Sequence, residues 1–86
     1  MILMDSETLE FVQRSTYRQK VLAALNGEVL MPKEIAERAD IKINYVSKVL
    51  SELKSKGLIE CVNPEVRKGR LYRLTNIGEE IMDDLD

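Results

Sequence analysis

Residues 43–57 restrict the fold of this chain more than any other stretch. Apolar residues recur there at i, i+3, i+4 and i+7, which is the spacing of one helix face: Val46, Val49, Leu50 and Leu53. The opposite side carries short polar or basic residues: Asn44, Lys48, Ser51 and Ser55. Gly57 follows, where the end of a helix favours a residue that adopts positive φ. The pattern predicts an amphipathic helix that ends near Gly57 and keeps a polar, cationic face in solvent.

Two short β-prone runs follow this helix, at residues 58–62 and 71–74. The loop between them contains Pro64 and Gly69, so the two runs predict a β-hairpin. Three cations surround the glycine near the tip of this hairpin: Arg67, Lys68 and Arg70. A helix with a polar outer face followed by a basic-tipped hairpin is typical of a winged helix-turn-helix.

Further helices are predicted on both sides of this unit. One begins at Ser15 or Thr16 and ends near residue 27, and another begins at Pro32, where the missing N–H costs nothing. Residues 28–31 are expected to form a short strand or an extended link. Thr75 is the predicted N-cap of the last helix, whose inner face we expect to comprise Ile77, Ile81 and Leu85, with Met82 beside them.

The expected fold class is α+β, mainly α: a winged helix-turn-helix with a three-helix core, a β-hairpin wing and a C-terminal helix. The 86 residues suffice for one core. Residues 15–80 are the predicted domain, 1–14 an N-terminal arm or short helix, and 81–86 the acidic end of the last helix. Apolar residues near both ends exceed the needs of a small core and predict a homodimer interface: Leu9, Phe11, Val12, Ile81, Met82 and Leu85.

Taken in order, four segments resemble those of small prokaryotic winged-helix transcription regulators. They are residues 32–39 (PKEIAERA), 46–53 (VSKVLSEL), 56–59 (KGLI) and 69–78 (GRLYRLTNIG). The chain is similar to the multiple-antibiotic-resistance and arsenic-resistance regulator groups, and most similar to short archaeal stand-alone versions, over about residues 15–80. The resemblance implies sequence-specific binding of double-stranded DNA by a homodimer that regulates transcription.

The net charge of −2 looks unfavourable for DNA binding until it is divided along the chain. Residues 42–73 hold eight basic and three acidic side chains, so this part carries +5 and the remainder −7. The local charge matters more than the total, because attraction to phosphate is screened beyond about 10 Å at ordinary salt. The asymmetry predicts one cationic face.

Nine residues are therefore the candidate DNA-binding set: Lys42, Asn44, Tyr45, Ser47, Lys48, Ser51, Arg67, Lys68 and Arg70. Those at the start of the helix suit a major groove, where Asn reads adenine and Lys reaches guanine acceptors. The wing cations suit the phosphate backbone or the minor groove. The alternatives are an ordinary solvated helix face and a solubilising hairpin tip, and for the whole chain a winged-helix protein-interaction module without DNA binding.

Other function classes are disfavoured by composition. With no histidine and one cysteine, the usual soft-metal ligands and His-dependent catalysis are missing, so we expect no metal, no cofactor and no enzyme activity. No long apolar run is present, and we expect a cytoplasmic protein with no membrane partner. Cys61 is interpreted as a packed thiol rather than a redox or ligand residue, and Tyr72 as core rather than a base-stacking platform.

Overall fold

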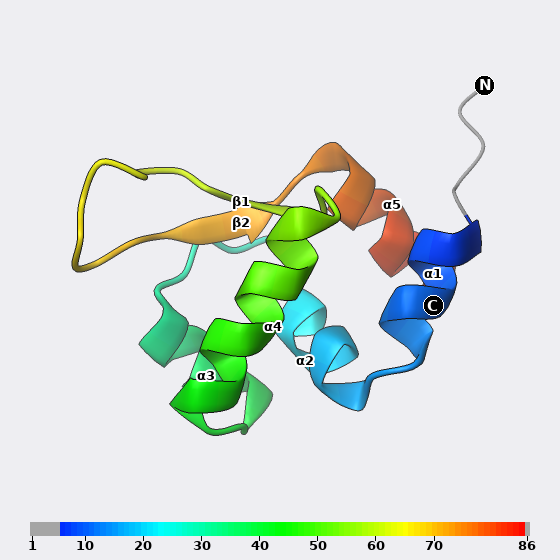
Figure 1. Ribbon diagram of the computed structural model, residues 1–86, viewed down its shortest axis with the longest axis horizontal. Coiled ribbons are helices and arrows are strands. Elements are labelled where there is room, and N and C mark those ends of the chain that lie inside the picture. The colour runs from blue at the N-terminus through cyan, green and yellow to red at the C-terminus, as the bar shows by residue number, and fades with distance from the viewer. Residues whose placement is uncertain (1–5, 86) are drawn as a thin grey trace.

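The computed structural model describes residues 6–85, which form five helices and one two-stranded sheet (Figure 1). The predicted winged helix-turn-helix is confirmed. In chain order the elements are α1 (Ser6–Gln13), α2 (Thr16–Leu25), α3 (Pro32–Ala39), α4 (Ile43–Ser55), β1 (Ile59–Cys61), β2 (Tyr72–Leu74) and α5 (Asn76–Leu85).

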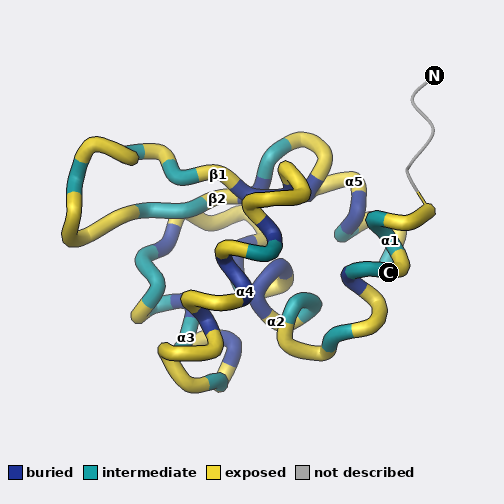
Figure 2. The backbone as a smooth tube through the Cα atoms, viewed as in Figure 1, coloured by how far each residue is buried: buried dark blue, intermediate teal, exposed yellow. Residues whose placement is uncertain are grey.

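The core lies where α2, α3, α4 and the base of the hairpin meet, and the outer loops are exposed (Figure 2). All four residues of the predicted apolar stripe on α4 are buried, as are three of α2: Val21, Leu22 and Leu25. Leu58 and Ile59 at the start of the hairpin are buried against them. Because α4 uses its whole apolar stripe inside the molecule, its polar face is left outside.

The predicted helix ends are confirmed where the structure gives their contacts. The hydroxyl of Ser15 accepts a hydrogen bond from the backbone N–H of Arg18, 3.2 Å away, and so caps α2. Thr75 caps α5 in the same way, with its Oγ1 accepting from the N–H of Gly78 at 3.1 Å. Gly57 follows the end of α4 with a φ of 74°, a backbone conformation that glycine adopts without strain.

The wing is an antiparallel hairpin in which Ile59 pairs with Leu74 and Cys61 pairs with Tyr72. Leu30 makes an isolated antiparallel bridge to Tyr72, so residues 28–31 are an extended link with one bridged residue pair and not a full strand. Tyr72 is half-buried and packs against the core, as predicted. Cys61 is also half-buried, and its thiol donates to Oδ1 of Asn63 at 3.6 Å. The thiol therefore has a hydrogen-bond partner inside the wing.

The inner face of α5 differs from the prediction. Ile77 is 50% exposed, whereas the buried residues of this helix are Gly78 and Ile81. The physical reason is a close approach of backbones: a Cβ added at Gly78 would fall onto the carbonyl oxygen of Leu58. Only a residue without a side chain fits at that contact, so the helix is turned to place Gly78 inward and Ile77 outward.

Two residues of the predicted dimer interface lie in the core of the protomer instead. Val12 and Ile81 are fully buried in the protomer's own core. Leu9, Phe11, Met82 and Leu85 are half-buried and pack against that core from its edge. Of the six predicted residues, the four half-buried ones therefore remain available to a second copy.

Candidate nucleic-acid interface

The polar face of α4 is open to solvent. Asn44, Ser47, Lys48 and Ser51 are all exposed, and so is Lys42, which precedes the helix as its N-cap residue. The Lys42 side chain makes no capping hydrogen bond, and Ser47 donates only a long bond, 3.4 Å, to the carbonyl of Ile43. These side chains have polar atoms that are available to a ligand.

The wing tip is held in shape by its own side chains. Asn63 closes the loop, because its Nδ2 donates to the carbonyl of Gly69 at 3.1 Å and its Oδ1 accepts from the N–H of Leu71 at 2.8 Å. Arg70 is turned back into the same loop, where its Nε donates to the carbonyl of Val66 at 2.7 Å. The guanidinium of Arg70 is thus partly engaged in holding the loop, although the residue is exposed.

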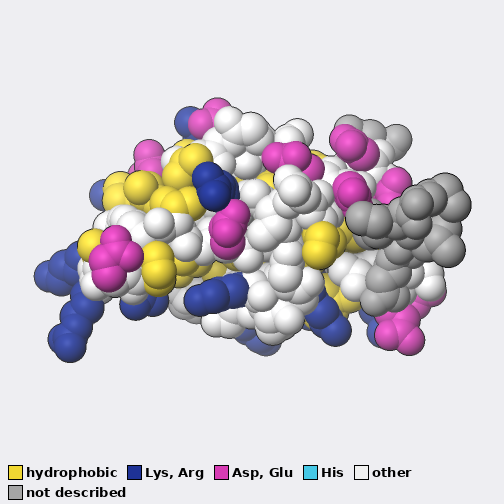
Figure 3. All heavy atoms as spheres, turned by 90° about the horizontal axis from the view of Figure 1, so that it is seen from above, with side chains coloured by type: hydrophobic (Ala, Val, Ile, Leu, Met, Phe, Trp, Pro, Cys, Tyr) yellow, Lys and Arg dark blue, Asp and Glu magenta, His cyan; other side chains and the backbone are white. Residues whose placement is uncertain are grey.

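Arg67 and Lys68 differ from Arg70. Both are exposed, and neither makes a hydrogen bond or ion pair with any residue in the range 6–85. In the view of Figure 3, basic side chains gather at the end of the molecule where the wing extends in Figure 1, and acidic ones are frequent toward the end that carries α1 and α5. The two free cations of the tip therefore lie at the basic end of an unevenly charged surface.

Tyr17, which the sequence left without a role, packs against Tyr45. The ring centroids lie 5.3 Å apart with an interplanar angle of 52°, a tilted arrangement that aromatic pairs favour. Tyr45 is in the first turns of α4 and Tyr17 is in α2, and both are more than a third exposed. The contact restricts where the Tyr45 ring lies beside the polar face of α4.

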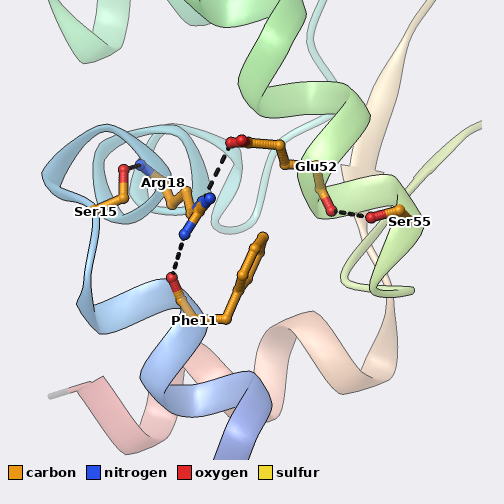
Figure 4. A network of polar contacts seen from close by, with 5 residues as sticks. All are labelled: Phe11, Ser15, Arg18, Glu52 and Ser55. Atoms are coloured by element: carbon orange, nitrogen blue, oxygen red, sulfur yellow. Dashed lines mark hydrogen bonds and ion pairs between the residues drawn. The ribbon is translucent and has the colours of Figure 1, made fainter.

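A polar network fixes α4 to the two helices that precede the helix-turn-helix (Figure 4). Arg18 of α2 donates from Nε to Oε1 of Glu52 at 3.2 Å and from Nη1 to the carbonyl of Phe11 at 2.7 Å. Its guanidinium carbon also lies 3.6 Å from the centroid of the Phe11 ring. One side chain thus joins α1, α2 and α4. Sequence reasoning missed this contact, because Arg18 and Glu52 are 34 positions apart and no local pattern links them.

The hydrogen bond from Arg18 lowers the pKa of Glu52 below its ordinary value of 4.5. The charges of Arg18 and Lys48 act in the same direction, whereas partial burial of the carboxylate acts against them. The charged form of Glu52 is therefore favoured in the folded protein. A lowered pKa of this kind stabilises the fold above the unfolded-state pKa, and that contribution is lost as pH falls through the folded-state pKa.

We therefore expect Glu52→Gln to destabilise the protein at about pH 7, and we expect this cost to shrink as pH falls through the lowered folded-state pKa of Glu52, because the wild-type carboxylate then becomes protonated as well. Urea unfolding of both proteins over a series of acidic pH values measures the difference. Glu60→Gln is the control, because the Glu60–Arg73 pair is about half exposed and contributes little. A cost of Glu52→Gln that stays constant with pH would show that the charge of Glu52 does not matter.

Two other features of the described part of the chain bear on its chemistry. Within residues 6–85, no group of three or more His, Cys, Asp or Glu side chains is arranged to hold a metal ion. None of the helices in that range is long and apolar enough to cross a membrane. What the described surface does offer is the exposed face of α4 and the basic tip of the wing.

No protein-family model matches this chain, and no curated protein matches it in sequence. Solved structures do match. TubR from Bacillus thuringiensis, bound to 24 bp of tubC, superposes with a TM-score of 0.80 at 21% identity, over 99% of this chain and 96% of TubR. A mutant of MarR from E. coli, complexed with operator DNA, gives a TM-score of 0.73 at 26% identity. PcaV, a transcriptional regulator from Streptomyces coelicolor, gives 0.72 at 28%.

These structural neighbours include winged-helix transcription regulators of the MarR family, so the predicted resemblance to multiple-antibiotic-resistance regulators is confirmed for the fold. The match covers 91% of this chain but 57% of MarR, and 80% of this chain but 50% of PcaV. The chain thus spans about half of the length of these regulators and nearly the whole of TubR. The expected closeness to archaeal versions stays a prediction.

Proposed function

We propose that this protein binds double-stranded DNA sequence-specifically and regulates transcription as a homodimer in the cytoplasm. The observation that carries the proposal is the division of α4: every residue of its apolar stripe is buried, and every residue of its polar stripe is exposed. An isolated helix face of this kind has the width and the donors to enter a major groove. The basic wing supplies contacts to the backbone beside it.

Within this proposal the first turns of α4 reach base edges. Asn44 reads adenine with its amide, Lys48 reaches guanine acceptors, and Ser47 and Ser51 bind bases or phosphates. Tyr45 lies at the side of this face with its ring held by Tyr17. Lys42 precedes the helix and suits a phosphate. The wing contributes Arg67 and Lys68 directly, whereas Arg70 acts mainly by holding the loop that carries them.

The proposal is tested with a fluorescence anisotropy titration of random-sequence duplex DNA over a series of salt concentrations. Binding that weakens steeply with salt is expected, because cations released from phosphate drive the association. The alternative, a winged-helix module that docks a partner protein, draws support from the net charge of −2. A protein-docking module should show no salt-dependent DNA binding. Anisotropy that does not change on addition of DNA, even at low salt, would therefore favour this alternative.

We expect Lys68→Ala to weaken binding to all duplexes alike and to reduce the slope of log K against log salt by about 1, if the side chain neutralises one phosphate. The slope is measured by repeating the salt series with the variant. Lys20→Ala removes the same charge from α2, outside the basic segment, and should leave the slope unchanged. Equal slopes for Lys68→Ala and wild type would mean that Lys68 contacts no phosphate and that the wing tip faces solvent or a partner protein instead.

The homodimer is proposed to form through α1 and α5. These helices contact each other, and in Figure 1 both lie on the side of the molecule away from the wing. Each carries half-buried apolar side chains at the edge of the core: Leu9, Phe11, Met82 and Leu85. Regulators of this kind gain affinity by presenting two recognition helices to half-sites about one helical turn apart. Two copies joined at these helices would leave both wings free.

Sedimentation velocity at tens of micromolar is expected to give a dimer for the wild type and a monomer for Leu85→Asp, because a buried, unpaired carboxylate is costly in an apolar interface. Val29→Asp places the same charge at an exposed apolar position outside α1 and α5 and should leave the dimer intact. Far-UV circular dichroism checks that both variants fold. A wild-type monomer at this concentration would remove the proposed interface.

A further inference from the structure

We propose that Ile43 recognises a thymine methyl group in the major groove and that the preferred duplex therefore carries a thymine at the base pair this side chain reaches. The inference rests on the proposed DNA binding and names a feature of the sequence that is bound. Ile43 is not among the nine residues that the polar pattern singled out.

Ile43 is the first residue of α4, and 51% of it is exposed to solvent. Every other apolar aliphatic residue of this helix is buried: Val46, Val49, Leu50 and Leu53. The core therefore does not depend on the Ile43 side chain, which leaves apolar surface in water at the start of the helix. Single exposed apolar residues are common on proteins, so what distinguishes Ile43 is its position on the helix.

That position is beside the polar face. A helix turns by about 100° per residue, so Ser47 lies one turn above Ile43 and about 40° around the axis, and Asn44 lies about 100° around it in the same direction. The buried apolar stripe lies on the other side of Ile43. The hydroxyl of Ser47 lies 3.4 Å from the Ile43 carbonyl oxygen, which agrees with this stacking. Ile43 is thus in the first turn of the helix, the part that contacts base edges when such a helix enters a groove.

In the major groove, the thymine methyl group is the one base group that suits an aliphatic side chain in the first turn of α4. All four bases present hydrogen-bonding groups there, which isoleucine is unable to satisfy, and only thymine also presents a methyl group. Contact between Ile43 and that methyl removes apolar surface of both from water. Cytosine in the same place would bring its amino group against an apolar side chain and leave it without a partner.

The experiment compares thymine with uracil, which differ by this methyl group alone. Duplexes are selected from a random-sequence library with the full chain, and each thymine of the selected site is then replaced by deoxyuridine, one at a time. For the wild type we expect one position in each half-site at which the replacement weakens binding about fourfold, the value of one buried methylene-sized group. The ratio of the two affinities is the readout.

Ile43→Ala is expected to bind the thymine and uracil duplexes with equal affinity, so that the ratio falls to about 1. Ile43→Val is expected to retain most of the wild-type ratio. Ile77→Ala is the matched control, because Ile77 is equally exposed but lies in α5. It should keep the wild-type ratio even if its overall affinity changes. Using a ratio removes any general effect of a substitution on folding or dimerisation.

Two outcomes overturn the inference and leave DNA binding intact: no thymine in the selected site is sensitive to loss of its methyl, or the sensitivity survives in Ile43→Ala. Failure of the library to yield any enriched duplex would instead contradict the proposed function, and the inference would fall with it. The two failures are distinguished at the selection step, before any uracil is introduced.

Discussion

Gly78→Ala is expected to lower the free energy of unfolding by about 3 kcal/mol, the upper part of the usual range for overpacking a well-packed site. The sign is informative, because exchanging glycine for alanine inside an exposed helix ordinarily stabilises by about 1 kcal/mol. Here the new Cβ would lie far inside contact distance of the Leu58 carbonyl oxygen, which is backbone and has no rotamer to change. Separating α5 from the hairpin is the remaining way to relieve the clash.

Urea denaturation measures this change, with Asn76→Ala as the control. Asn76 is in the same helix turn but is exposed, so its substitution is expected to alter stability by no more than about 0.5 kcal/mol. A Gly78→Ala protein as stable as the wild type would mean that α5 does not approach the start of the hairpin as closely as described.

Asn44→Ala is expected to weaken binding to a selected duplex by about 1–3 kcal/mol while changing binding to random DNA little. The amide of Asn44 is exposed in the first turn of α4, and in the folded chain it makes no hydrogen bond with another described residue. Its loss should therefore affect reading of bases and not folding. Anisotropy titrations of the two duplexes at one salt concentration give the comparison.

Asn76→Ala is the control for this prediction too, because it removes an exposed asparagine from α5, which is not part of the proposed DNA interface. It should bind both duplexes as the wild type does. If Asn44→Ala weakened selected and random DNA equally, Asn44 would contact the backbone, and specificity would have to come from other residues of α4.

The parts of the fold that depend on neighbouring residues were predictable from the sequence. The apolar stripe of α4, the caps at Ser15 and Thr75 and the turn at Gly57 each follow from residues within one or two helical turns. Helical periodicity and capping chemistry act at that range, so a single sequence contains enough information.

Features that depend on how elements pack were not predictable. The periodicity of α5 allows either Ile77 or Gly78 to face inward, and only the approach of the Leu58 backbone decides between them. Arg18 and Glu52 are brought together by the packing of α2 on α4. The three cations of the wing are equivalent in sequence, yet the curvature of the loop turns Arg70 toward backbone carbonyls and leaves Arg67 outside.

The uneven charge of the molecule has a consequence for how it meets a duplex. The segment from residue 42 to 73 carries +5 and the rest of the chain −7, and the molecule measures 37 Å along its longest axis. The electric field of a nucleic acid exerts a torque as well as a force on a protein with this charge distribution. If the protein binds DNA as proposed, encounters that begin with the acidic terminal helices are expected to be repelled, so that the protein rotates until the wing leads. Association should then be fast at low salt despite a net charge of the same sign as DNA, and it should slow as added salt shortens the range over which this rotation acts.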